Sequence, residues 1–405
     1  MPDGSGAPPP LAGLTVVSFE QAVAAPYCTR LLGDLGARVV KVERPGAGDF
    51  TRAYDDVADG LATHFVWLNR NKESLALDVK APAARAALDR LLDTADVVVQ
   101  NLAPGAAKRL GLDAAGLVAA RPRLVAVDMS GYGTGGPMDH RRAYDLLVQA
   151  EAGACATTGE PGRPAKPGPP VADVGSGLQA AVAILAALVG RGVHGRGAAI
   201  EVSMFDTVTD FLGFALLHAR YSGRERPPIG MSSPVVSPYG AYSTRDGRIA
   251  VLGTTNDAEW QRLARQVVDR PDLADDPALA TNGQRCEQRG RIDAAIGEWA
   301  RGRDLADVLA RADAAGIGNA VYNEVLDVVE HPQLTGRGRW QEVGSPVGPV
   351  ASLLPPWTSD AWTTPLAPVP AVGEHTRAIL TELGLPGGEV DALCAAAGLP
   401  APTTA

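Results

Sequence analysis

The chain has few cysteines and histidines, and those it has are scattered. Its four cysteines form no CxxC pair and lie far apart, at Cys28, Cys155, Cys286 and Cys394. Its six histidines show no HExxH or comparable spacing. Zinc sites and disulfide frameworks need clustered ligands or paired cysteines. We therefore expect no metal site, no disulfide scaffold and a reducing, cytoplasmic location.

Long basic runs and long apolar runs are also missing. The net charge is −9, so we expect neither a nucleic-acid partner nor an anionic membrane surface. The longest apolar run, 180–190, is too short to span a bilayer and predicts a buried helix. Residues 1–10 are rich in Pro and Gly and lack the apolar segment of a signal peptide. They predict a loose N-terminal tail.

Several catalytic motifs are absent as well. The turn after the first predicted strand reads EQAVAA (20–25), without the GxGxxG of a dinucleotide site, although Glu43 stands where a ribose-binding acid belongs. A glycine-rich stretch, GYGTGGP (131–137), lacks the Lys-Ser/Thr of a P-loop, so it is either a phosphate cradle or a plain connection. There is no GxSxG nucleophile elbow. Acyl transfer would have to use a carboxylate, and Asp173 and Asp145 are the candidates.

What the chain does have is an alternation of β-branched runs and helical stretches. Strands are predicted at 14–19, 38–43, 97–100, 124–129 and 200–202, and helices at 26–35 and 82–92. This order favours an α/β fold, with a parallel sheet covered by helices on both faces.

The alternation of strand-like and helix-like segments ends after about residue 220. Prolines interrupt the chain there, and 239–252 reads as a hairpin with Arg-Asp-Gly at its turn. Helical segments follow to about 314, and a Pro-rich return (347–370) leads into a helical C-terminal tail. We predict a large α/β domain at 11–222, a smaller α+β domain at 223–330, and a return to the large domain at 331–405.

The segment PPVADVGSG (169–177) precedes the apolar run and is the most informative of the chain. It places the Asp173 carboxylate at a small-residue turn that opens a helix. Proline stiffens the approach, and Gly175 and Gly177 let a substrate come close. A carboxylate held there is poised to attack an acyl carbon. The alternative is that Asp173 only caps the helix N-terminus.

A set of motifs then occurs in order along nearly the whole chain: LAGL (11–14) with Phe19, AP (25–26), LGARVVKVE (35–43), GAGD (46–49), NRNK (69–72), LDVK (77–80), NLAPG (101–105), RLG (109–111), GYG (131–133), GRG (195–197), HP (331–332) and GEHT (373–376). Together they make the chain resemble the class III CoA-transferases. That group includes formyl-CoA and carnitine CoA-transferases and α-methylacyl-CoA racemase.

The resemblance implies an interlocked homodimer of Rossmann-like large domains and small domains, with the active site between domains at the dimer interface. It implies no tightly bound cofactor, with coenzyme A and acyl-CoA as substrates. Asp173 matches the family's nucleophile. The matching CoA-binding positions are Val23, Ala24, Arg44, Leu77, Val79, Lys80, Asn101, Leu102, Arg109, Arg142, Tyr144 and Asp145.

Two departures from formyl-CoA transferase are visible. Val23 replaces a Gln that helps to hold the oxyanion there, so only backbone N–H groups remain. The glycine-rich lid is replaced by GMSSP (230–234).

Alternatives to transfer are racemisation and non-catalytic CoA binding. Racemases carry a His before the acid that matches Asp145, and this chain has Tyr144, whose phenol (ordinary pKa about 10) is a poor base at neutral pH. We therefore expect transfer.

Segments 230–234, 252–257 and 340–346 resemble transferases of C4–C5 dicarboxylates such as mesaconate, itaconate, citramalate or succinate. Ser232 and Ser233 could bind a second carboxylate or could cap a turn. Transfer within one substrate and transfer between two substrates both stay open.

Overall fold

The computed structural model describes residues 7–401. The chain divides into two compact units. Unit 1 comprises Met1–Ala154, Pro167–Phe214 and Arg337–Ala405, and unit 2 comprises Cys155–Lys166 and Ala215–Gly336. The division differs in detail from the expected one, because unit 2 begins earlier than 223 and also takes residues 155–166.

Positions 1–6 of the expected tail lie outside the described residues. The end of the expected tail and the residue after it, Leu11, lie against the turn that follows α1. The N–H of Leu11 donates to the carbonyl of Leu35 at 3.0 Å. Pro9 lies so close to Gly36 that a Cβ added there would be 2.4 Å from the Cβ of Pro9.

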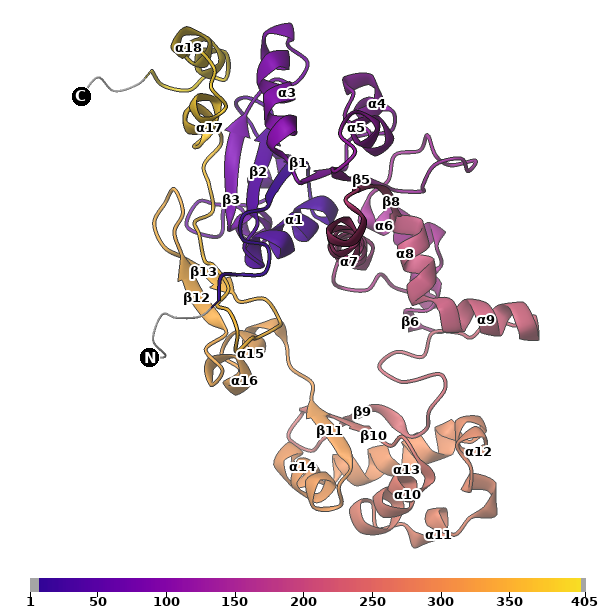
Figure 1. The fold of residues 1–405 in the computed structure, drawn as a ribbon. Coiled ribbons are helices and arrows are strands. Elements are labelled where there is room, and N and C mark those ends of the chain that lie inside the picture. The colour runs from indigo at the N-terminus through magenta and orange to yellow at the C-terminus, as the bar shows by residue number, and fades with distance from the viewer. Residues whose placement is uncertain (1–6, 402–405) are drawn as a thin grey trace. The chain divides into compact units, whose positions relative to one another are not determined.

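Unit 1 is built on a parallel six-stranded sheet of order β3-β2-β1-β4-β5-β8 (Figure 1). Its strands are β1 (Thr15–Phe19), β2 (Arg38–Glu43), β3 (Lys72–Ala76), β4 (Val97–Gln100), β5 (Val125–Ser130) and β8 (Ala198–Ser203). The expected parallel sheet and α/β class are confirmed, and β3 was not predicted. Because β1 pairs with both β2 and β4, the strand order reverses beside it.

Helices cover both faces of this sheet. They are α1 (Ala24–Asp34), α2 (Thr63–Asn69), α3 (Arg85–Thr94), α4 (Ala106–Leu110), α5 (Ala114–Ala120), α6 (Asp145–Glu151), α7 (Val171–His194), α8 (Met204–Phe211), α17 (Thr376–Glu382) and α18 (Gly387–Ala396). Successive residues of β1 serve opposite faces. Val17 and Phe19 pack with α3, α5, α17 and α18, whereas Val16 packs with α1 and α7. A two-stranded sheet of β12 (Trp340–Val343) and β13 (Val350–Leu353) completes the unit.

Unit 2 has an antiparallel sheet of order β11-β10-β9 with helices packed on it. Its strands are β9 (Tyr239–Ser243), β10 (Ile249–Gly253) and β11 (Gly318–Val321), and a small hairpin joins β6 (Gly159–Glu160) to β7 (Arg163–Pro164). Its helices are α10 (Asp257–Arg262), α11 (Pro271–Ala274), α12 (Asn282–Glu287), α13 (Arg289–Arg301), α14 (Leu305–Ala314), α15 (Val325–Val329) and α16 (Pro332–Thr335). The helix α9 (Gly213–Ser222) lies across the boundary of the units.

Helices α1 and α7 approach each other very closely. A Cβ added at Gly177 would lie 2.6 Å from the carbonyl oxygen of Ala24 and 3.2 Å from the backbone nitrogen of Cys28. A Cβ at Gly175 would lie 2.5 Å from the ring of Phe211, at the end of α8. The two glycines were expected to admit substrate. In the structure each glycine instead leaves room for a neighbouring helix, α1 at Gly177 and α8 at Gly175.

The apolar run forms part of the expected helix, α7, but the helix is buried on one face only. In α7 the side chains of Leu178, Val182, Val189 and Val193 are between 42% and 83% exposed. Their spacing of 4, 7 and 4 residues puts them on one stripe of the helix. By length and composition, α7 is also the one described helix that could cross a membrane.

We predict that Gly177→Ala destabilises unit 1 by about 1–3 kcal/mol, because the added methyl meets backbone atoms that cannot move aside cheaply. Urea unfolding measures the change. Gly192→Ala is the matched control, since nothing lies within 4 Å of its added Cβ. It should stabilise the same helix by about 0.5–1 kcal/mol. Equal effects of the two substitutions would contradict the close approach.

Candidate active site

The sequence-predicted CoA positions follow the carboxyl ends of the parallel strands. Val23 and Ala24 come after β1, Arg44 after β2, residues 77–80 after β3, and Asn101 with Leu102 after β4. Carboxyl ends of parallel strands lie along one edge of a sheet. Ligands of such sheets bind at this edge, beside the point where the strand order reverses. The β1–α1 turn stands at that point (Figure 1).

Asp173 is the third residue of α7. The N-cap position is Pro170, which offers no side-chain cap, so Asp173 is not the N-cap residue. Asp145, the first residue of α6, provides an acceptor instead: its Oδ1 accepts from the N–H of Ala172 at 3.0 Å and of Asp173 at 3.4 Å. Gln149 Nε2 donates to the other oxygen of Asp145 at 2.6 Å. The carboxylate of Asp145 thereby fixes the helix start that carries Asp173.

Asp173 lies on the face of α7 that meets α1. It is one helical turn before Gly177, and residues four apart share a face. Gly177 touches the first turn of α1. The N–H groups of Val23, Ala24 and Ala25 at that turn have no hydrogen-bond partner among the described residues. The helix start that carries these N–H groups therefore packs against the helix that carries Asp173, one turn from it.

Tyr54 was missed by the sequence analysis and belongs to the surroundings of Asp173. Partial burial and the negative charges of Asp49 and Asp173 raise the pKa of the Tyr54 phenol. The centroid of the Tyr54 ring lies 5.4 Å from that of the His64 ring and 5.8 Å from that of the Phe50 ring. Tyr54 is half exposed. Tyr54 follows the GAGD motif by five residues, and only the folded chain reveals its proximity to Asp173.

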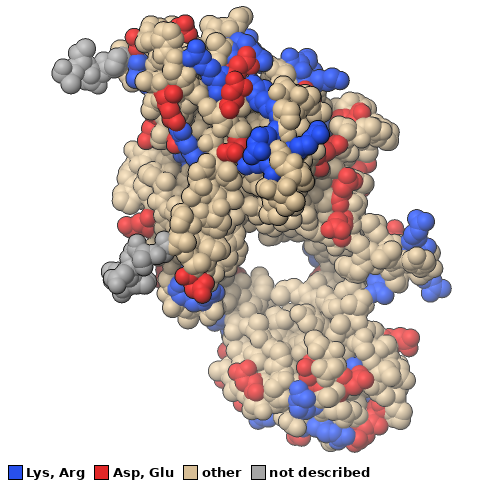
Figure 2. All heavy atoms as spheres, in the orientation of Figure 1, with Lys and Arg blue, Asp and Glu red and all other residues tan. Residues whose placement is uncertain are grey.

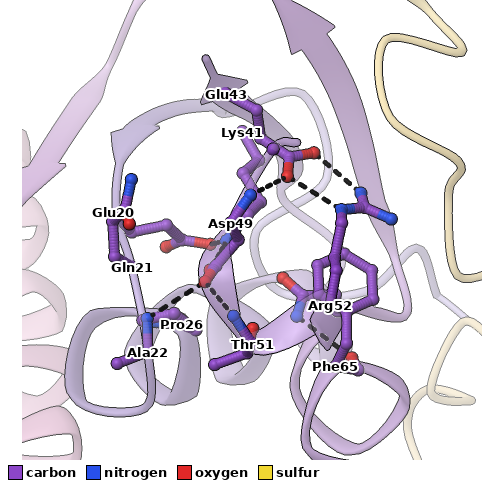
Figure 3. A network of polar contacts seen from close by, with 12 residues as sticks. Glu20, Gln21, Ala22, Pro26, Lys41, Glu43, Asp49, Thr51, Arg52 and Phe65 are labelled. Carbon is purple, nitrogen blue, oxygen red and sulfur yellow. Dashed lines mark hydrogen bonds and ion pairs between the residues drawn. The ribbon is translucent and has the colours of Figure 1, made fainter. Parts of the chain in front are cut away.

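A cluster of buried charges lies beside the β1–α1 turn (Figure 3). Lys72 Nζ donates to Glu20 Oε1 at 2.7 Å, and Lys41 Nζ reaches the same oxygen at 3.3 Å. Burial alone would raise the pKa of Glu20, but the ammonium groups of Lys72 and Lys41 outweigh it and lower that pKa to about 2. Burial lowers the pKa of Lys72 to about 8 despite its carboxylate partner. The cluster holds Glu20, the residue that follows β1, in place.

Asn101 holds the same turn from the β4 side. Its Oδ1 accepts from the N–H of Gln21 at 2.9 Å, and its Nδ2 donates to the carbonyl of Gln21 at 2.8 Å. This reciprocal pair spans the two strands between which the order reverses. A direct contact of the Asn101 side chain with coenzyme A stays a prediction.

The predicted phosphate-binding cations are exposed. Arg44, Lys80, Arg109 and Arg142 all have exposed side chains, and Arg44 Nε donates to the carbonyl of Gly48 at 2.8 Å. Figure 2 shows Lys and Arg gathered on the face of unit 1 that carries α3, α4 and α5, interspersed with carboxylates. Of the other predicted positions, Leu77 is buried, Val79 and Leu102 are partly buried, and Tyr144 is exposed at the N-cap of α6.

Ser232 and Ser233 lie in unit 2, where they hold a turn. Ser232 Oγ donates to the carbonyl of Tyr239 at 2.5 Å and accepts from Arg289 Nη1 at 2.8 Å. Ser233 Oγ accepts from the N–H of Val235 at 3.4 Å. Arg289, which the sequence analysis missed, also donates to the carbonyls of Ser233 and Val236.

No cluster of three or more His, Cys, Asp and Glu suited to a metal ion occurs in residues 7–401. All four cysteines are free, and burial raises the pKa of the Cys28 thiol. In the loop 131–137, Thr134 Oγ1 donates to Glu201 at 2.8 Å, which places a negative charge beside the candidate phosphate cradle.

Comparisons with known proteins agree over almost the whole chain. The model of the family described as CoA-transferase family III matches residues 11–376. A succinate–glutarate CoA-transferase from Agrobacterium fabrum is 32% identical, with 95% of this chain and 98% of the relative covered. A succinyl-CoA–D-citramalate CoA-transferase from Chloroflexus aurantiacus is 30% identical, with 93% and 94% covered. The crystal structure of a CAIB/BAIF family protein from Brucella suis has a TM-score of 0.80 at 33% identity, covering 93% of this chain and 100% of that one.

We predict that Glu20→Gln destabilises the protein by about 3–5 kcal/mol at pH 7, because it leaves two buried ammonium groups short of a partner. The pKa of Glu20 is lowered from 4.5 to about 2 in the folded state. Its stabilising contribution is therefore present above pH 4.5 and is lost as the pH falls toward 2. The difference between variant and wild type should shrink over that range in urea unfolding.

Glu382→Gln serves as the control for this substitution, since it breaks an exposed ion pair with Arg38. Its cost should stay within about 1 kcal/mol. A gap between Glu20→Gln and wild type that stays constant from pH 7 to pH 3 would rule out the assigned role.

Proposed function

We propose that this chain, which belongs to CoA-transferase family III, moves coenzyme A from an acyl-CoA thioester to a small dicarboxylic acid, with Asp173 as the nucleophile. The observation that carries the assignment of the nucleophile is the placement of Asp173. It stands in the first turn of α7, where the helix N-terminus favours a carboxylate, and on the face that meets the free N–H groups of α1.

The chemistry follows from a carboxylate beside N–H donors. The Asp173 carboxylate attacks the thioester carbonyl, the carbon–sulfur bond breaks, and coenzyme A leaves as the thiolate. A mixed anhydride remains on Asp173. The thiolate then attacks the aspartyl carbonyl, and the donor acid leaves as a carboxylate. This second step leaves coenzyme A joined to Asp173 as a thioester.

The acceptor acid reverses the sequence. Its carboxylate attacks the aspartyl thioester and expels the thiolate, which then attacks the acceptor's carbonyl in the new anhydride. Asp173 is released as a carboxylate. Every step exchanges one carboxylate or thiolate for another, so no proton needs to be supplied.

Each addition creates an oxyanion that needs hydrogen-bond donors. Val23 carries no donor in its side chain, and we assign this role to the backbone N–H groups at the start of α1. One such donor contributes a factor of roughly 10²–10³ to kcat. The side chain of Val23 is buried, which helps to keep water from the anhydride.

Coenzyme A binding is assigned to the carboxyl edge of the sheet. Arg44, Arg109 and Arg142 neutralise its phosphates. Lys80, which follows the end of β3 in the sequence, belongs to the same binding edge. Val23, Ala24, Leu77, Val79, Asn101 and Leu102 contact the remainder of coenzyme A. Tyr144 and Asp145 shape the reacting end.

The acceptor class rests on the relatives. By its name, one relative described above acts on succinate and glutarate. The other, by its name, acts on succinyl-CoA and D-citramalate. We assign a C4–C5 dicarboxylate to this chain, and Ser232 and Ser233 are our candidates for binding its second carboxylate. Tyr144 in place of a basic His argues against racemisation, because a phenol removes an α-proton poorly at neutral pH.

We also propose that two copies of the chain interlock in the cytoplasm, without a membrane or nucleic-acid partner. The apolar stripe of α7 supports association with another chain, since large apolar patches of that kind mark interaction sites. The other face of the same helix packs on α1 and the sheet, which favours a protein surface over a bilayer as its cover.

We expect Asp173→Ala to lower kcat for transfer from succinyl-CoA to glutarate by about four orders of magnitude or more. Binding of the CoA ester, measured by calorimetry, should change little. The matched control is Asp206→Ala, which removes an exposed aspartate from the same third position of α8. Near-normal turnover by Asp173→Ala would refute the nucleophile.

Incubation with a chiral 2-methylacyl-CoA in deuterated water separates transfer from racemisation. We expect no α-deuterium in the recovered thioester when no acceptor acid is present, because Tyr144 is too weak a base. Mass spectrometry reads the outcome. Rapid incorporation of deuterium would establish racemase activity instead.

Light scattering should give the protein in solution a mass about twice the 41.9 kDa of one chain. Val189→Glu puts a charge in the apolar stripe and should shift the protein toward monomer or aggregate. Ala119→Glu adds the same charge at an exposed position of α5 and should leave the mass unchanged. A monomeric wild type would exclude the interlocked dimer.

A further inference from the structure

The carboxylate of Asp49 is buried and joins three segments of unit 1 (Figure 3). Its Oδ2 accepts from Lys41 Nζ on β2 at 2.8 Å. Its Oδ1 accepts from the N–H of Thr51 at 3.0 Å and from that of Ala22 at 3.4 Å. Asp49 is thereby the cap of the 3-10 turn η1 (Phe50–Ala53) and the partner of the β1–α1 turn.

Ala22 needs such a partner. Its φ is +62°, in the left-handed region that a residue with a Cβ adopts only at a cost. Such a conformation persists where the surroundings hold it. The next residue, Val23, is the N-cap of α1. The conformation of Ala22 therefore sets the direction of the N–H groups that follow it.

The neighbouring residue is held by a different side chain. Asn101 takes both the N–H and the carbonyl of Gln21, as described above. No other side chain among the described residues accepts from the N–H of Ala22. The turn is thus held at successive residues by β4 and by Asp49, and only Asp49 acts at the left-handed position.

We propose that Asp49 is a positioning residue for transfer: it holds Ala22 in its left-handed conformation, so that the N–H groups of Val23 and Ala24 point at the oxyanion formed beside Asp173. This rests on the proposed function, of which it explains one part. Lys41 holds the Asp49 carboxylate in place, and Asp49 itself does not touch the reacting atoms. Through η1 the same carboxylate also sets the start of the segment that leads to Tyr54.

The first test replaces the charge and keeps the shape. In Asp49→Asn, kcat for succinyl-CoA and glutarate should fall roughly 10- to 100-fold, the cost of misplaced catalytic groups, while KM for the CoA ester stays within about twofold. Asp34→Asn is the matched control. Asp34 is equally buried and is paired with Arg30 and Arg70, but it lies at the far end of α1 from the turn. It should lower the melting temperature and leave kcat within about twofold of wild type.

Two substitutions at Ala22 test the role without touching the buried charges. Ala22→Val puts a β-branched residue at positive φ and should reproduce the loss of kcat with KM unchanged. Glycine adopts this conformation freely. Adding Ala22→Gly to Asp49→Asn should therefore restore part of kcat, by about fivefold, the factor that corresponds to 1 kcal/mol.

The outcomes separate this inference from the proposed function. If wild type transfers coenzyme A and Asp173→Ala does not, the function stands whatever Asp49 does. In that case, normal kcat in both Asp49→Asn and Ala22→Val overturns the positioning role. A loss of kcat in Asp34→Asn as large as in Asp49→Asn overturns it too, and so does a failure of Ala22→Gly to rescue. Should Asp49→Asn not fold, Ala22→Val alone decides. A wild type inactive with every acid and CoA ester overturns both.

Discussion

The close approach of α1 and α7 at Gly177 is the contact on which the rest of the site depends. It leaves no room for a Cβ between the helices, so the start of α1 lies against the first turns of α7. Asp173 is one turn away on the same face. Asp173 and the N–H groups of Val23 and Ala24, which have no partner among the described residues, belong to segments about 150 residues apart that meet through the packing of α1 on α7. Helix contact, more than any local motif, would assemble the proposed nucleophile with its proposed donors.

The carboxylates of Asp145 and Glu20 hold the two segments that meet at the contact between α1 and α7. Asp145 accepts from the N–H groups of α7 and fixes the start of the helix, while Glu20 and its two lysines fix the end of β1. Buried ion clusters of this kind add little net stability relative to apolar packing, but losing one member is costly. Here Lys41 and Lys72 hold Glu20 at the start of the β1–α1 turn, and so restrict that turn. Catalysis by preorganised donors needs that restriction.

The sequence was informative where side chains follow backbone periodicity. Residues 38–43 were predicted as a strand and form β2 with the same bounds. The strand β3 was missed because its buried positions include Lys72 and Ser74, which are paired with Glu20 and Glu43 and so break the apolar pattern. Asp173 could be singled out because Pro and Gly flank it. Tyr54 and the capping role of Asp145 could not, since each depends on a contact with a distant segment. The exposed stripe of α7 also escaped, because composition does not tell a helix buried in its own chain from one with an open face.

In the proposed mechanism Asp173 becomes covalently joined first to the acyl group and then to coenzyme A. Mass spectrometry tests it directly: the enzyme is incubated with succinyl-CoA alone, trapped with hydroxylamine, and digested. We expect a hydroxamate on the peptide that carries Asp173 and on no other aspartate, with none formed when free coenzyme A replaces the thioester. An active enzyme whose Asp173 peptide stays unmodified, or a hydroxamate at another carboxylate, would show that Asp173 is not the nucleophile.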